Sequence, residues 1–312
     1  MTIRDAHPRR LARSTGPFQA LRFFAVTALL HTAVAAVDPS AFDQARTLFE
    51  THRPAEAQQA FEKLLAADPK DPEVNYYLGQ LANRRNESEK ATGYFQQAVA
   101  VAPNVGRYHH GLGDAFGRSA QKASVFSQFG LAKKCVASYE RAVALEPDNA
   151  DFRYSLFEYY RQAPGLVGGG YDKAVGEATA IKKINPTRGR IAFATLYAGE
   201  KKYDLAIAEF DDVLKLDPDN FTALYQIGRL AAVTGQFADR GIASLRHCLE
   251  LPAPTEPDTP GHAAAQWRLG ILLQKKSDLD GARRAFEAGA RLDPTFAPVV
   301  EALAKLDGKK RN

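Results

Sequence analysis

The chain has 312 residues, of which 45% are hydrophobic and 25% charged, a composition typical of a folded soluble protein rather than a disordered one. Its formal net charge is +5, but five of the 41 Lys and Arg residues and one of the 36 Asp and Glu residues precede residue 37. The rest of the chain is therefore nearly neutral, and no basic run with interleaved aromatic residues follows. These features argue against nucleic-acid binding.

Residues 1–36 have the pattern of a secretory signal peptide. Five arginines precede an uncharged run from Phe23 to Val37, which contains the small-residue pattern Ala33–Ala36. A basic start, a short apolar centre and an A-x-A exit define such a peptide. We expect cleavage after Ala35 or Ala36, ordinary export rather than the twin-arginine route, and a periplasmic or secreted protein with no membrane span. An uncleaved anchor and a cytoplasmic tail are the alternatives.

A proline recurs along the rest of the chain, each time after a short apolar or acidic motif. Successive prolines are separated by 34, 44, 39, 32, 34 and 42 residues, which indicates a unit of about 34 residues with occasional insertions. A fold with one central core has no reason to repeat such a stop signal. The prolines are Pro69, Pro103, Pro147, Pro186, Pro218, Pro252 and Pro294.

Two helical patterns precede each proline. Before Pro103, a first helix carries Leu78-Gly79, and a second carries Ala91, Phe95 and Ala98 on one face, at intervals of four and three. The glycine lets the second helix approach closely, and the proline then ends that helix. The same spacing recurs in Ala57, Phe61 and Leu64; in Cys135, Tyr139 and Ala142; in Ala206, Phe210 and Val213; and in Gly270, Ala282, Phe286 and Gly289.

With these motifs the chain resembles a bacterial tetratricopeptide repeat protein. The first-helix signature is repeated in Leu112-Gly113, Ile227-Gly228 and Leu269-Gly270, and the resemblance covers roughly Asp38 to Asp307. It implies an all-α, right-handed α-solenoid of about seven helix-turn-helix repeats, forming one domain over residues 37–312. The amphipathic segment 296–307 is expected to form a C-terminal capping helix.

Two repeats depart from the pattern. The fourth has Leu156-Phe157 in place of Leu-Gly and Ala174 and Ala178 in place of Ala and Phe, so its helices are expected to pack differently. In the sixth, the register slips by one residue around Arg240-Gly241.

Two insertions distinguish this chain. They lie near residues 119–130, including Phe126 and Phe129, and near residues 163–170, which end in three glycines. Both separate the two helices of a repeat, so they map to one face of a solenoid and are expected to meet. We predict that they form a composite lip beside the binding groove, with Phe126 and Phe129 either docked as an extra helical turn or offered to a partner.

The expected binding surface is the concave groove lined by the first helices. In register, one groove-facing position holds Phe42, Tyr76, His110, Tyr154, Ile191, Tyr225 and Trp267, and the position one turn later holds Arg46, Gln80, Asp114, Glu158, Thr195, Arg229 and Ile271. Aromatic rings with interspersed polar groups suit an extended peptide or a partner helix. About half of the rings are expected to pack against the next repeat instead.

The sequence contains no catalytic, cofactor-binding or metal-binding motif that we recognise. Gly168-Gly169-Gly170 is read as a turn, with an anion-binding backbone nest as the alternative. Cys135 and Cys248 are expected to be buried free thiols. The Lys and Asn clamp with which some members of the resembled family hold acidic C-termini is missing, so such peptides are not the expected ligands.

We therefore predict a non-catalytic scaffold of the cell envelope, which binds a protein or peptide and uses no cofactor. The specific alternatives are a subunit of an envelope assembly or secretion complex and, less favoured, an enzyme with a site in the groove or at the glycine insertion.

Overall fold

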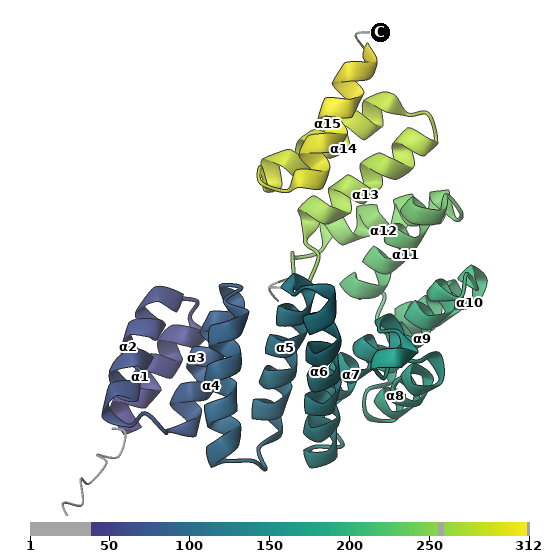
Figure 1. Cartoon of the computed structure of the whole chain (residues 1–312). Helices are drawn as coiled ribbons and strands as arrows, with labels where there is room; N and C mark the ends of the chain where they lie inside the picture. Colours follow the sequence, from purple (N-terminus) through teal and green to yellow (C-terminus); the bar gives the residue numbers. More distant parts are fainter. Residues whose placement is uncertain (1–38, 255–258, 311–312) are drawn as a thin grey trace, which may run out of the picture. The chain divides into compact units, whose positions relative to one another are not determined.

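The computed structural model describes residues 39–254 and 259–310, and within them it contains fifteen α-helices, one short 3-10 helix and no strand (Figure 1). The predicted signal peptide, residues 1–36, lies outside the described residues. No helix in the described ranges combines the length and apolar character needed to cross a bilayer.

The helices pair into seven hairpins followed by one last helix. The pairs are α1 (Pro39–Glu50) and α2 (Pro54–Ala67), α3 (Pro72–Arg84) and α4 (Ser88–Val101), α5 (Gly106–Lys122) and α6 (Val125–Leu145), α7 (Ala150–Gln162) and α8 (Tyr171–Ile184), α9 (Pro186–Gly199) and α10 (Tyr203–Leu216), α11 (Phe221–Thr234) and α12 (Ala238–Glu250), and α13 (His262–Lys275) and α14 (Leu279–Leu292); α15 (Ala297–Lys310) follows. The predicted all-α solenoid of about seven hairpins with a capping helix is confirmed.

The recurring prolines set the ends of the second helices. In every hairpin the last residue of the second helix lies two positions before the proline. A proline disfavours helical geometry in the residue before it, so the helix ends one residue earlier still. Between α8 and α9 this leaves Asn185 alone as the connection, and its side chain accepts a hydrogen bond from the backbone of Arg188 to begin α9.

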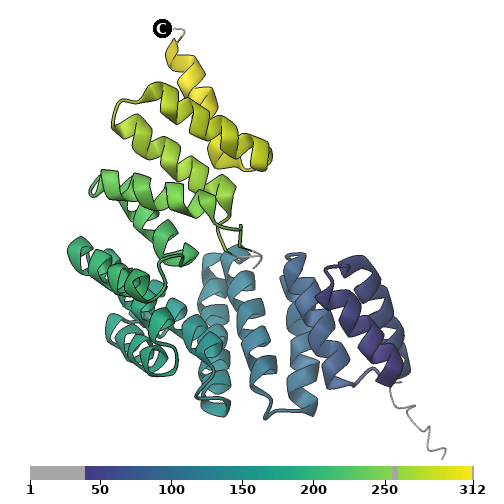
Figure 2. The ribbon, with the colours of Figure 1, turned by 180° about the vertical axis from the view of Figure 1, so that it is seen from behind.

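Each helix packs against its neighbours in the chain, and the first helices also contact one another. The contacting first helices include α3 with α5, α7 with α9 and α11 with α13, and α13 also contacts α15. First helices therefore lie closer together than second helices and form the inner layer of the array, the surface that helical repeats use for binding. Figure 2 shows the same hairpins from behind.

The buried residues form four overlapping clusters along the chain rather than one central core. The first draws on residues between Ala45 and Leu81, and the later ones follow in chain order up to Leu306. Each hairpin therefore buries its apolar face against the next, as expected for a repeat array.

In the two irregular repeats, other side chains than usual fill the contact between the two helices. In the fourth, Phe157 of the first helix is fully buried in one cluster with Ala174 and Ala178 of the second, so the large side chain has moved to the opposite helix. In the sixth, Leu245 replaces the usual phenylalanine and packs closely on Gly228. Both exchanges keep one large side chain opposite small ones, which preserves the packed volume.

The two insertions are structured and lie against each other. The first extends α5 and α6 and leaves only Ala123 and Ser124 between them, while the second contains the 3-10 helix Gly165–Val167. This 3-10 helix contacts α6. The meeting of the insertions therefore places a wall beside repeats three and four.

The last helix covers the end of the array. Val299 and Leu306 of α15 are buried in the same cluster as Phe286 of α14. Without α15, the apolar face of the seventh hairpin would be exposed to water, so this helix acts as a cap.

Candidate partner-binding site

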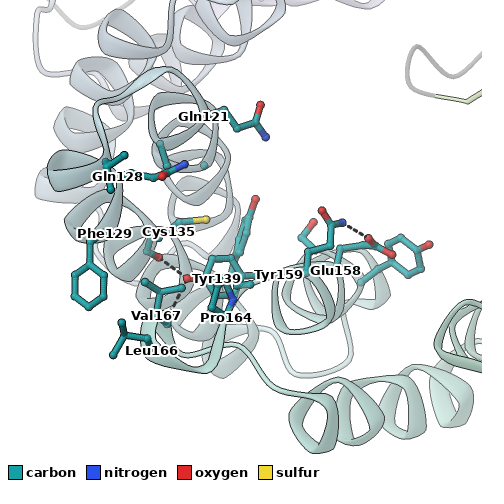
Figure 3. A pocket seen from close by; sticks show the side chains of 18 residues that line it. Gln121, Gln128, Phe129, Cys135, Tyr139, Glu158, Tyr159, Pro164, Leu166 and Val167 are labelled. Carbon is teal, nitrogen blue, oxygen red and sulfur yellow. Dashed lines mark hydrogen bonds between the residues drawn. The ribbon is translucent and has the colours of Figure 1, made fainter. Parts of the chain in front are cut away.

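A cavity of about 760 Å³ opens between the two insertions and the helices of repeats three and four. Its surface is mostly apolar, and its walls come from the end of α5, the first half of α6, helix α7 and residues 163–167. In the view of Figure 3, Phe129 and Leu166 lie on one side of it and Glu158 on the other. Apolar clefts with a few polar groups are the usual form of a binding site.

Tyr159 fixes the second insertion against α6. Its hydroxyl donates to the carbonyl oxygens of Ala132, at 2.9 Å, and Val167, at 2.7 Å (Figure 3). Burial raises the pKa of this phenol to about 12, so the hydroxyl keeps its proton at neutral pH. The wall of the cavity is thus held by a neutral donor.

The glycines of the second insertion serve the turn rather than an anion. The backbone amides of Gly168, Gly169 and Gly170 donate to the carbonyls of Gly165, Pro164 and Tyr160, at 2.9, 3.2 and 2.8 Å. Gly168 has φ of +95°, a conformation that favours glycine. Because all three amides are occupied, the anion-nest interpretation is wrong, and the glycines support no separate site.

The floor of the cavity contains Tyr139 and Cys135, both buried. The Tyr139 hydroxyl donates to Oδ1 of Asp114 at 2.6 Å. Burial, followed by the negative charge of Asp114, raises the pKa of both Tyr139 and Cys135, for Cys135 to about 12. The thiol is therefore a protonated packing group, as predicted, and no described cysteine forms a disulfide.

His110 joins repeat three to repeat four beneath the same cavity. Its ring stacks on Phe152 with centroids 4.8 Å apart, and Nε2 lies 2.8 Å from the hydroxyl of Ser155. Ser155 itself lines the cavity. His110 and Asp114 were predicted as groove residues. In the structure His110 positions Ser155, and Asp114 positions Tyr139, and both of these partners line the cavity.

Amide and carboxylate groups provide the polar part of the lining. They are Gln121 of α5, Gln128 of α6, and Glu158 and Gln162 of α7. Glu158 accepts hydrogen bonds from Arg161 and Gln162, both at 2.6 Å, so its charge is already matched. The three glutamines were not among the predicted residues. Their positions within or next to the two insertions could have marked them as candidate binding residues.

Only some of the predicted site residues line the cavity. Phe129, Tyr154 and Glu158 line the cavity, and Phe129 is 37% exposed. Phe126 is 95% exposed and lies outside the lining.

The other predicted residues are not part of the cavity lining. Tyr76 packs 5.4 Å from the Tyr108 ring, and Trp267 packs edge-on to Phe296 at 5.9 Å. Tyr225 is 5% exposed and its ring stacks beside that of Phe221, with centroids 6.5 Å apart; its role in binding a ligand stays a prediction. Arg229 of α11 is half-buried and is considered below.

The sequence model of the tetratricopeptide repeat family matches residues 42–116 and 191–246. These segments cover most of repeats one and two and the start of repeat three, together with much of repeats five and six. The chain contains tetratricopeptide repeats. Stacked repeats of this kind generally act as non-catalytic scaffolds that bind proteins along an extended surface. None of the curated proteins compared with the chain matches it.

Solved structures share the fold of this tetratricopeptide array. A tetratricopeptide repeat protein from Parabacteroides merdae has 15% identity and a TM-score of 0.62, covering 86% of this chain and 97% of that one. Yeast Tom70 has 16% identity and a TM-score of 0.63, covering 83% of this chain and 52% of Tom70. A chain of the APC/C hetero-tetramer Cut9–Hcn1 has 16% identity and a TM-score of 0.53, covering 90% and 51%. At these identities the likeness concerns the fold.

Proposed function

We propose that this protein is a non-catalytic scaffold of the cell envelope that binds a protein or peptide partner across its first helices. The observation that supports the proposal is the cavity between the two insertions, which opens beside Tyr154 of α7. It adds a recessed apolar site to a fold whose general role is protein binding.

The chemistry of the lining suits a polypeptide ligand. Apolar side chains of a partner gain free energy by leaving water for the surface formed by Val125, Phe129 and Leu166. The amides of Gln121 and Gln128 can donate to and accept from a peptide backbone. Val125 and Leu166 of this lining are 79% and 78% exposed, so the apolar surface continues to the outside of the protein.

The experiment is capture of partners from an envelope fraction with the purified chain, followed by mass spectrometry. Gln128→Trp places a bulky ring in the cavity, whereas Gln97→Trp makes the same change at an exposed position of α4. We expect Gln128→Trp to reduce the recovered partner at least tenfold and Gln97→Trp to leave it unchanged. Equal recovery with both variants would contradict a partner site at the cavity.

The envelope location rests on the pattern of residues 1–36 and needs its own test. We expect the N-terminus of the chain recovered from the native host to begin at Ala36 or Val37, in the periplasmic or secreted fraction. A chain recovered from the cytoplasm with residues 1–36 attached would overturn the location and leave the binding proposal intact.

A further inference from the structure

Two half-buried arginines on the inner layer, Arg229 and Arg268, have no acidic partner among the residues that the structure describes. Arg229 of α11 donates from Nε to the side-chain oxygen of Gln226 at 2.6 Å, and Arg268 of α13 lies 4.0 Å from the centre of the Trp267 ring. Nε of Arg268 is buried and has no hydrogen-bond partner. Within the described residues, neither guanidinium forms an ion pair with a carboxylate.

Several other arginines in the described part of the chain pair with carboxylates. Arg161 pairs with Glu158, Arg153 with Glu177, and Arg190 with Glu209 and Asp212 at distances of 2.6 to 2.9 Å, and Arg188 pairs with Asp151. Arg153, Arg188, Arg190 and Arg240 are partly buried, as Arg229 and Arg268 are, and each of those four has a carboxylate partner. Buried charges are normally paired, because an unpaired ion loses its hydration without compensation.

Arg229 and Arg268 lie on two first helices that contact each other, α11 and α13. Burial, and then the positive charge of Arg268, lower the pKa of the Arg229 guanidinium, with a smaller contribution from Arg161. Because the charge of Arg268 disfavours the charged form of Arg229, an anion placed near both guanidinium groups would be attracted by both. The site is thus prepared for a carboxylate, which a planar guanidinium binds through two parallel hydrogen bonds.

This charge lies near the cavity. Arg229 is close enough to Tyr154, a lining residue, for its charge to act on the Tyr154 phenol, as do Glu158, Arg188 and Arg161. Glu158 and Arg161 also act on Arg229. An extended ligand that leaves the cavity past Tyr154 therefore comes under the field of Arg229.

We propose that the ligand is a segment of a partner protein whose apolar side chains enter the cavity while an Asp or Glu side chain binds between Arg229 and Arg268. The inference rests on the proposed function and specifies which side chains the partner segment must carry. A peptide fits better than a lipid, because the cavity is wide, open and edged with glutamine amides that match a backbone. The acidic group is a side chain, which needs no terminal Lys and Asn clamp.

The test is selection of a random 12-residue peptide library displayed on phage against the purified chain. The displayed peptides are fused at their C-termini, so they carry no free terminal carboxylate. We expect the enriched peptides to combine apolar residues with at least one Asp or Glu. Their affinity should fall as salt rises, because screening weakens the charge interaction.

Parallel selections use two doubly substituted chains. Arg229→Gln with Arg268→Gln should remove the preference for Asp and Glu, retain the apolar preference, and weaken the best acidic peptide by tenfold or more. Arg107→Gln with Arg190→Gln changes arginines that already pair with carboxylates, and it should leave the acidic preference unchanged. Circular dichroism melting curves confirm that each variant is folded.

The outcomes separate this inference from the proposed function. Peptides that are enriched without acidic residues, or whose acidic preference survives in the Arg229→Gln, Arg268→Gln chain, would overturn the inference and leave peptide binding in place. Failure to enrich any peptide on the unsubstituted chain would overturn both.

Discussion

The backbone of Gly111 in α5 approaches the ring of Phe95 in α4 so closely that a Cβ atom at Gly111 would lie 2.5 Å from ring carbon Cε1. Gly79 of α3 faces the same ring, and a Cβ there would lie 2.8 Å from it. One phenylalanine thus fills the space between two consecutive repeats, and two glycines make that space available.

This contact predicts the effect of adding a single methyl group. Gly111→Ala forces the fully buried Phe95 ring or the helices to move, and we expect a loss of about 1–3 kcal/mol in the free energy of unfolding. Gly93→Ala is the matched control, because a Cβ at Gly93 meets nothing within 4 Å. It should stabilise by about 0.5–1 kcal/mol, since alanine favours a helix. Urea unfolding measures both; equal effects would contradict the packing argument.

The second prediction concerns the wall of the cavity. Tyr159→Phe removes the hydroxyl that donates to Ala132 and Val167, and we expect a cost of about 1 kcal/mol. Hydrogen exchange should become faster in residues 163–170, because their link to α6 is lost. Tyr171→Phe, at an exposed tyrosine that begins α8, should change neither quantity. Unchanged exchange in Tyr159→Phe would show that other contacts hold the insertion.

The third prediction is a loss of stability at alkaline pH. Burial raises the pKa of Cys135 and Cys248 from 9.0 to about 12, so the folded chain holds both thiol protons more tightly than the unfolded chain does. Their contribution is therefore complete below about pH 9 and declines as pH rises from 9 to 12. Each thiol contributes a slope of up to about 1.4 kcal/mol per pH unit.

Denaturant unfolding between pH 7 and 11 measures this slope. The Cys135→Ala, Cys248→Ala chain should lose less stability than the unsubstituted chain above pH 9, although partly buried tyrosines such as Tyr159 still contribute above pH 10. Parallel pH curves for the two chains would mean that the thiols ionise normally.

The fourth prediction compares two adjacent valines of the cap. Val299 is fully buried and Val300 is 47% exposed. Val299→Asp buries a charge without a partner, which we expect to cost about 3 kcal/mol or more and to release α15 from α14. The exposed apolar face should then cause aggregation, seen as increased light scattering. Val300→Asp should leave both stability and scattering near their original values.

The repeats are predictable from sequence because their signals are local. A Leu-Gly pair, an Ala-x3-Phe spacing and a proline each act within one hairpin, so Gly79, Phe95 and Pro103 specify a helix pair without reference to distant residues. The sequence also shows that Phe157 occupies the position that glycine holds in other repeats. Ala178, at the position where other repeats have phenylalanine, compensates for the larger volume of Phe157, because each hairpin needs one large side chain at this contact.

The cavity and its charges are less predictable because they depend on distances between residues far apart in the chain. The sequence leaves open whether Phe126 and Phe129 dock as an extra helical turn or are offered to a partner. In the structure the inserted residues continue α5 and α6, so this wall of the cavity is helical. The contact of Tyr159 with Ala132 depends on how two hairpins stack. Likewise, Arg229 has no sequence feature that distinguishes it from the paired Arg161; only the positions of surrounding carboxylates do so.

The single-residue connection at Asn185 has a mechanical consequence. Ile184 ends α8 and Pro186 begins α9, so the fourth and fifth hairpins have no spare chain between them. Under tension, an array of stacked hairpins extends by changing the angles between its units. This joint should be among the stiffest along the array, and elongation should concentrate at the longer connections elsewhere, as force spectroscopy on tethered molecules would record.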